Sequence, residues 1–151
     1  MGAFFFIRIP FRTSHLYCSP INARVDLDSS AGPGNFNVTT ATANSPLSIK
    51  FISQPVDSIL TYKGATANSP ATLALAPAFE GKFSFATTPW FTARLEQDDK
   101  VEDPTGAGRK RTVHSSPAGF PGIEGSVGWG DHAGKSFADF GTANDRITLF
   151  L

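Results

Sequence analysis

The chain has 151 residues, and its 13 Lys and Arg balance its 13 Asp and Glu, so the formal net charge at pH 7 is zero. This length suits one domain that buries about 70% of the surface exposed by the unfolded chain. Neutrality gives no electrostatic reason to expect nucleic acid or an anionic membrane as a partner. With 40% hydrophobic and 17% charged residues, the composition argues against a disordered chain, and the 14 Phe, 14 Gly and 11 Pro are typical of strands joined by turns.

The first 20 residues match neither a secretory signal nor a membrane span. Their apolar run, residues 3–7, ends at Arg8. A signal peptide needs roughly 7–15 apolar residues, and a membrane helix needs about 20. We interpret residues 1–20 as an N-terminal extension, either an edge strand or a misassigned start of the reading frame, and residues 21–151 as a single domain. The lone cysteine, Cys18, cannot form an intramolecular disulfide, which together with the missing signal favours an intracellular location.

The tripeptide Thr-Ala-Asn occurs three times, at residues 42–44, 66–68 and 142–144. When the copies are aligned, apolar residues stand five, seven and nine positions after each threonine, with mostly polar or small residues between them. Alternation with period two predicts a strand with one buried face. The predicted inward residues are Leu47, Ile49 and Phe51, then Ala71, Leu73 and Leu75, then Ile147, Leu149 and Leu151.

A second strand is predicted ahead of each threonine. Phe36 and Val38 mark it in the first copy, Leu60 and Tyr62 in the second, and the weaker pair Ser136 and Ala138 in the third. The asparagine of each tripeptide marks a turn, because Asn tolerates left-handed backbone and bonds its own chain locally. Each unit is therefore predicted to be a strand, a turn and a strand.

A degenerate copy occupies residues 81–95, with Thr87 in the position of the repeated threonine. Its predicted inward residues are Phe83 and Phe85 before the turn, and Phe91, Ala93 and Leu95 after it. Units that recur every 20–25 residues favour an all-β fold of stacked strand–turn–strand repeats, short and β-solenoid-like. The alternative is an antiparallel β-sandwich or barrel with similar hairpins.

The alternation stops between residues 96 and 122, where five acidic residues precede the three bases Arg109, Lys110 and Arg111. Such a stretch predicts one long polar loop inserted between strands. Within it, residues 111–116 are the best candidate for a strand, with Val113 facing inward.

The sequence lacks convincing catalytic or metal-binding motifs. The segment "GWGDHAGKS" (128–136) fails the register of a phosphate-binding loop, and no Gly-x-Ser-x-Gly elbow is present. The histidines, His15, His114 and His132, have no metal-ligand spacing. We therefore expect no cofactor and no metal, and a binding protein in preference to an enzyme. A small hydrolase-like site near His114 or His132 is the alternative, because triads assemble in space.

Two groups of residues are candidates for binding. Trp90 and Trp129 are candidates for a sugar-stacking face, since aromatic rings with a polar tip suit half-wet surfaces. Burial at the ends of the core is the structural alternative, favoured because large aromatic residues are mostly buried. The three bases Arg109, Lys110 and Arg111 are candidates for binding phosphate or an anionic polymer. The alternative is that they belong to a solvated loop and bind no ligand.

Four motifs in order along residues 25–151 resemble a fungal β-rich domain family of unknown function. The matching positions are Phe79, Gly81 and Phe83; Asp103, Pro104, Gly106, Gly108, Arg109 and Arg111; Gly125, Val127, Trp129 and Gly130; and Thr142, Asn144, Ile147 and Leu149. The resemblance implies a β-rich fold and a basidiomycete or ascomycete source, but no activity and no catalytic residue. The turn-centred repeats are also distantly similar to putative adhesin domains of bacterial surface proteins.

From these features we expect a non-catalytic binding or scaffold module. Glycan or cell-wall polymer is the first ligand to test. A protein partner, recruited by an exposed strand edge, is the second.

Overall fold

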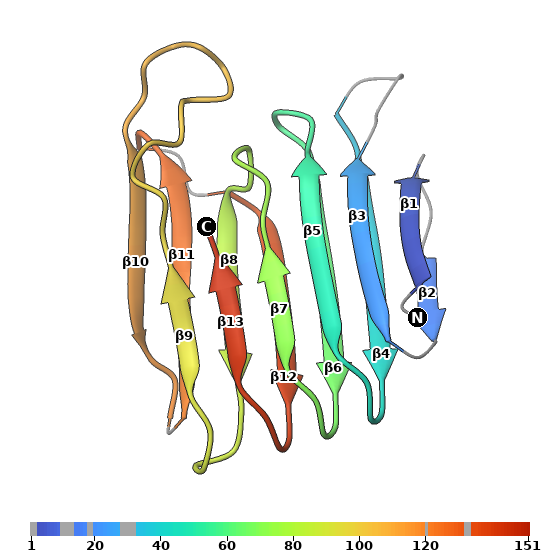
Figure 1. Ribbon diagram of the computed structural model, residues 1–151. Coiled ribbons are helices and arrows are strands. Elements are labelled where there is room, and N and C mark those ends of the chain that lie inside the picture. Colours follow the sequence, from blue (N-terminus) through green and yellow to red (C-terminus); the bar gives the residue numbers. More distant parts are fainter. Residues whose placement is uncertain (1–2, 10–13, 18–19, 28–32, 120, 132–133) are drawn as a thin grey trace.

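The computed structural model describes residues 3–9, 14–17, 20–27, 33–119, 121–131 and 134–151. These residues form 13 strands and no helix, so the prediction of an all-β fold is confirmed (Figure 1). The described residues accordingly contain no helix long and apolar enough to cross a membrane. The strands are β1 (Ala3–Ile9), β2 (Ser14–Tyr17), β3 (Ile21–Leu27), β4 (Asn35–Thr42), β5 (Leu47–Ser53), β6 (Ile59–Thr66), β7 (Ala71–Ala74), β8 (Gly81–Ala86), β9 (Ala93–Glu96), β10 (Arg111–Pro117), β11 (Gly122–Trp129), β12 (Ser136–Thr142) and β13 (Ile147–Phe150).

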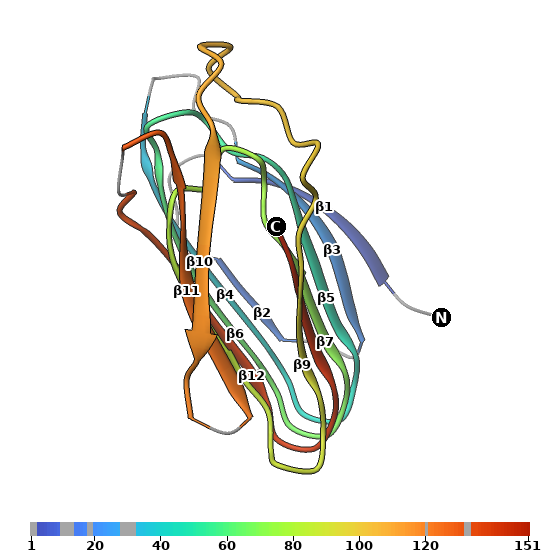
Figure 2. The same cartoon turned by 90° about the vertical axis from the view of Figure 1, so that its left-hand side faces the viewer.

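The strands form two sheets that face each other (Figure 2). One sheet has the order β1-β3-β5-β7-β13-β9, and the other has the order β10-β11-β8-β12-β6-β4-β2. This two-layer arrangement fits the sandwich alternative. Nine of the eleven strand pairs among the described residues are parallel, however, and antiparallel pairing is confined to β10–β11 and β11–β8.

From β1 to β9 successive strands alternate between the two sheets, and the repeats form strand–turn–strand units as predicted. The next three strands, β10, β11 and β12, lie in the same sheet. The units β4–β5 and β6–β7 follow each other in space as they do in sequence. The last unit, β12–β13, does not extend the stack. It lies between β6–β7 on one side and β8–β9 on the other, pairing in parallel with both (Figure 1).

The alignment of the repeats is reproduced by the pairing of the strands. Thr66 pairs with Thr42 on one side and with Thr142 on the other, and Leu73 pairs with Ile49 and with Leu149. The predicted inward residues of the three copies lie in the core, each at most 7% exposed: Phe36, Val38, Leu47, Ile49, Phe51, Leu60, Tyr62, Ala71, Leu73, Leu75, Ser136, Ala138, Ile147, Leu149 and Leu151. The buried-face prediction is therefore confirmed for these units.

The Thr-Ala-Asn tripeptides lie above one another at the turns and bond between units. The Asn68 amide donates to the Asn44 side-chain oxygen, and the Asn144 amide donates to the Asn68 side-chain oxygen, each over 2.6 Å. The threonine hydroxyls bond in the same direction: Thr66 donates to the Ser45 carbonyl over 3.3 Å, and Thr142 to the Ser69 carbonyl over 3.0 Å. The tripeptide therefore recurs at positions where the turn of each unit is hydrogen-bonded to the turn of the neighbouring unit.

The degenerate copy follows the prediction in part. Phe83 and Phe85 are buried, and Ala93 and Leu95 pack against the core from half-buried positions. The inward assignment of Phe91 is wrong, since this ring is 37% exposed. Phe91 precedes β9, in a turn closed by its own N–H and the Thr88 carbonyl, so the alternation of the strand has not yet begun.

Segments outside the three Thr-Ala-Asn repeats form both ends of the stack. The described parts of residues 1–20 form β1 and β2, edge strands of the two sheets, which is one of the two expected alternatives. Cys18 lies outside the described residues. At the other end, β10 contains the predicted strand at residues 111–116, and Val113 packs against the core as predicted. The long polar loop therefore comprises residues 97–110, followed by an edge hairpin.

Candidate functional site

All five candidate binding residues lie at the β9 end of the stack, and four of them, Trp129 and the three bases, line one pocket. Beyond β8, the seven-stranded sheet continues with β11 and β10, whereas the six-stranded sheet ends at β9 (Figure 2). Residues 97–110 connect β9 to β10 and project beyond the strand ends (Figure 1). This connection and the start of β10 form the walls of a pocket described below.

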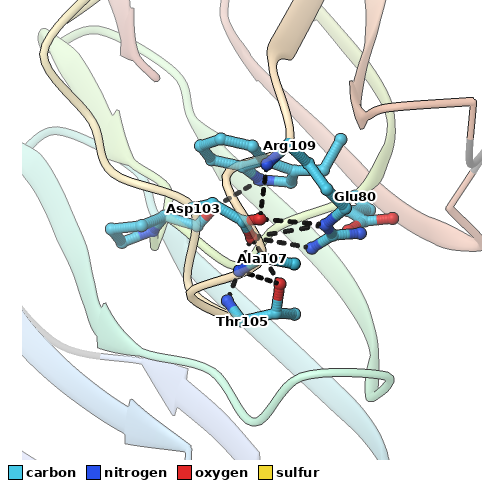
Figure 3. Close-up of polar contacts among 7 residues, drawn as sticks. Glu80, Asp103, Thr105, Ala107 and Arg109 are labelled. Carbon is cyan, nitrogen blue, oxygen red and sulfur yellow. Dashed lines mark hydrogen bonds and ion pairs between the residues drawn. The ribbon is translucent and has the colours of Figure 1, made fainter.

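The projecting loop is ordered by one carboxylate (Figure 3). Asp103 accepts hydrogen bonds from the backbone N–H of Thr105 at 3.0 Å, from the Thr105 hydroxyl at 2.8 Å and from the backbone N–H of Arg109 at 2.8 Å. Its side chain is only 3% exposed. Gly106 and Gly108 both have φ of +70°, a conformation that side chains with a Cβ adopt rarely. The Asp-Pro-Thr-Gly-Ala-Gly-Arg sequence thus closes on itself.

Arg109 joins this loop to the rest of the fold. Its guanidinium donates to Asp103 over 3.0 Å and to Glu80, just ahead of β8, over 3.2 Å (Figure 3). The hydrogen bonds from Arg109 hold the pKa of the Asp103 carboxyl well below its usual range, and the same bonds raise the pKa of Arg109. Arg109 is therefore a structural cation whose charge is already matched by two carboxylates.

The pocket beside this loop has a volume of about 340 Å³. One wall comes from residues 97–101, which include the exposed carboxylates of Asp98 and Asp99, and the other from residues 109–113. Trp129, at the end of β11, lines it from the protein interior. The pocket thus combines carboxylates, three bases and an aromatic ring, a set of groups that offers both donors and acceptors to a small ligand.

Arg111 is a partly buried base in this pocket whose guanidinium forms no hydrogen bond or ion pair with the described residues. Its guanidinium carbon lies 5.9 Å from the centroid of the Trp129 ring, within the range of a cation–π contact. Its Nε and Nη2 atoms are buried and have no hydrogen-bond partner among the described residues. Burial lowers the pKa of Arg111, and the nearby charge of Asp98 partly opposes this effect. This is an electrostatically costly arrangement, since buried charged groups are normally paired.

The two tryptophans differ in exposure. Trp129 is 1% exposed, and its indole N–H donates to the Pro77 carbonyl over 3.0 Å. An exposed sugar-stacking role for Trp129 is therefore wrong, because the ring is part of the protein interior. Trp90 is 88% exposed and lies away from the pocket, in the turn between β8 and β9.

Trp90 lies in a groove of about 730 Å³. One side is formed by Pro89, Trp90 and Phe91 from the β8–β9 turn, and the other by Pro117 and Pro121 from the β10–β11 turn, with Ile123 behind them. Phe91 and these prolines were not among the binding residues predicted from the sequence. The available signal was the run "TTPWF" (87–91), where a proline and a tryptophan share a predicted turn.

The histidines give no assembled catalytic site among the described residues. His114 is exposed on β10 and lines a shallow hollow of about 290 Å³ with Ser126 and Asp131. Its side chain makes no hydrogen bond within the described part of the chain, and His132 lies outside that part. The described residues also contain no group of three or more His, Cys, Asp or Glu placed to hold a metal ion. The hydrolase alternative stays a prediction.

Comparison with known protein families, with curated proteins and with solved structures gives no match. The resemblance to the fungal domain family and to bacterial adhesin domains therefore stays a prediction based on the motifs quoted above.

Proposed function

We propose that the protein is a non-catalytic binding module that takes carbohydrate in the groove around Trp90. The observation that carries this proposal is the 88% exposure of Trp90, beside the partly exposed ring of Phe91. A folded chain gains nothing in stability by leaving a large aromatic ring in water, so exposed apolar patches of this kind commonly mark interaction sites. Sugar rings present flat C–H faces that stack on indole while their hydroxyl groups stay hydrated.

The surroundings of Trp90 support a preformed site. Proline fixes φ, and Pro89, Pro117 and Pro121 lie on both sides of the groove. The β8–β9 turn is closed by the bond from Phe91 N–H to the Thr88 carbonyl, and the opposite turn by the bond from Gly122 N–H to the Gly119 carbonyl. Little conformational entropy is then lost when a ligand binds, which favours affinity from a small contact area.

We also infer that the stack is a short β-solenoid. Parallel pairing in constant register, with each unit crossing from one sheet to the other, supports this class. A rigid stack of this kind would hold the groove in place as a scaffold. The resemblance to adhesin domains agrees with such a role, as an analogy of fold.

The proposal is tested by titrating the protein with a panel of soluble neutral oligosaccharides while recording tryptophan fluorescence. Because Trp129 is buried, a change in the emission from an exposed tryptophan reports on Trp90. We expect at least one oligosaccharide to shift this emission toward shorter wavelength, and Trp90→Ala to abolish binding measured by calorimetry.

A matched control is Phe150→Ala, which removes another exposed aromatic ring, 39% exposed, from β13. This change should leave oligosaccharide binding unaltered. Absence of binding across the panel, or equal losses in both variants, would rule out the proposed site. Capture of an extended peptide along the exposed edge of β10 would instead favour the protein-binding alternative.

A further inference from the structure

We propose that the pocket between residues 97–101 and 109–113 binds a small monocarboxylate, with Arg111 as the anion-binding group above the ring of Trp129. This site is separate from the Trp90 groove. Arg111 begins β10 and Pro117 ends it, so the two sites lie roughly 20 Å apart at about 3.3 Å per residue. The proposal therefore stands or fails independently of carbohydrate binding in the groove.

The three bases around the pocket differ in whether their charges are already paired. Arg109 already bonds Asp103 and Glu80, both within 3.2 Å, so it has little charge to offer a ligand. Lys110 is exposed, so its ammonium group can stay in water. Arg111 is different, since two of its three nitrogens are buried without a hydrogen-bond partner among the described residues. A carboxylate that reaches these two nitrogens from the pocket would supply the acceptors that the described residues do not provide.

The planar guanidinium of Arg111 matches the shape of a carboxylate. Arginine cannot escape burial by losing its proton, and its planar fork pairs carboxylates through two parallel hydrogen bonds. The Trp129 ring, which its hydrogen bond to Pro77 fixes in place, lies 5.9 Å from the Arg111 guanidinium carbon, within the range of a cation–π contact. The cation is thus positioned before any ligand arrives, which favours planar anions over a diffuse anionic surface.

The acidic residues on the facing wall favour a ligand with a single negative charge. Asp98 and Asp99 lie on the facing wall of the same pocket. Their carboxylates repel a doubly charged phosphate more strongly than a singly charged carboxylate. They also accept hydrogen bonds, so a ligand whose carboxylate meets Arg111 is favoured when it carries hydroxyl or ammonium donors for the opposite wall. A volume of about 340 Å³ suits a molecule the size of one sugar acid or one amino acid.

The test is calorimetric titration of the whole chain, in a buffer free of carboxylates, with glucuronate, glycine and inorganic phosphate as separate probes. Glucuronate supplies hydroxyl donors and glycine an ammonium donor, so the two distinguish a sugar acid from an amino acid. We expect one of them to bind with one site per chain and to bind about tenfold or more tightly than phosphate. Glucose, which lacks the carboxylate, should show no binding that Arg111→Gln weakens.

The variants assign the site to Arg111. Arg111→Gln keeps most of the stem but removes the charge, and should weaken binding of that carboxylate about tenfold or more, as expected for a charge-assisted hydrogen bond. Lys63→Gln removes an exposed charge from β6, outside the pocket, and should change affinity by less than about threefold. If Arg111→Gln does not fold, Arg111→Lys keeps the charge without the fork, and should also weaken binding.

Asp98→Asn separates a ligand from an internal partner. If the pocket serves an anion, this variant should fold as stably as the parent and should bind phosphate more tightly, because one repelling charge is gone. A large loss of thermal stability in Asp98→Asn would show that Asp98 is the partner of Arg111 in solution, and would overturn the proposal. Failure of both carboxylates to bind, or binding unchanged by either substitution of Arg111, would overturn it as well.

Discussion

The hydroxyl group of Thr87 donates a hydrogen bond of 2.5 Å to the backbone carbonyl of Asp145, a residue 58 positions later in the chain. Thr142 bonds the carbonyl of Ser69 in the same way, and Thr66 bonds that of Ser45. In each case the acceptor lies three residues after the threonine of the neighbouring unit. The most divergent unit therefore retains the contact that joins the regular ones.

Thr87→Val tests this contact. Valine matches the shape of threonine but cannot donate, so the change removes one hydrogen bond from a residue that is only 8% exposed. We expect the free energy of unfolding to fall by about 1–3 kcal/mol, because the carbonyl partner loses its donor where water has poor access. Urea denaturation measures the loss. Thr72→Val, at a half-buried outward position of β7, is the control and should be close to neutral or slightly stabilising.

The asparagine ladder gives a second prediction. Asn68 bonds both Asn44 and Asn144, whereas each of these bonds only Asn68 within the ladder. Asn68→Ala should therefore destabilise more than Asn44→Ala or Asn144→Ala, by about 0.5–1.5 kcal/mol for each bond and toward the lower end because the side chains are exposed. Thermal melts of the three variants give the ranking. Equal effects would mean that the amides are satisfied by water and that the ladder adds no stability.

Much of the fold could be predicted from the sequence, because period two fixes which residues share a face. Thr42, Thr66 and Thr142 were aligned by their tripeptides, and the structure pairs them. The position of the last unit could not be predicted in this way. Every unit presents similar apolar residues to its neighbours, so nothing in the alternation indicates that the β12–β13 unit lies between the β6–β7 and β8–β9 units and not beyond them.

The candidate sites were less predictable than the fold. Arg109, Lys110 and Arg111 are adjacent in sequence, yet only the structure separates their environments, since Arg109 is engaged by Asp103 and Glu80 while Arg111 faces Trp129. Trp90 and Trp129 were equivalent candidates in the sequence. Trp129 ends a strand that faces the core, whereas Trp90 follows a proline in a turn, and this difference in local backbone decides which ring reaches water.

Leu73→Ala tests the shared core. Leu73 is fully buried between Ile49 and Leu149, its partners in the adjacent strands. Removing its side chain leaves a cavity inside two packed sheets, and we expect a loss of about 2–5 kcal/mol in unfolding free energy. Ile52→Ala is the control, since Ile52 is 40% exposed on β5 and should lose well under half as much. An unchanged midpoint for Leu73→Ala would contradict the register of the stack.

The loop at Asp103 predicts a pH dependence. Its pKa is lowered in the folded protein by hydrogen bonds from Arg109, while the unfolded chain has the ordinary value, near 3.9. A depressed carboxyl pKa stabilises the fold above the unfolded value, and that contribution is lost as pH falls from there toward the folded pKa. The stability difference between the parent and Asp103→Asn should therefore be constant above about pH 5 and should shrink progressively below about pH 4. Urea midpoints of both proteins between pH 3 and pH 7 measure it. A difference for Asp103→Asn that is independent of pH would show that its hydrogen bonds do not depend on the charge of the carboxylate.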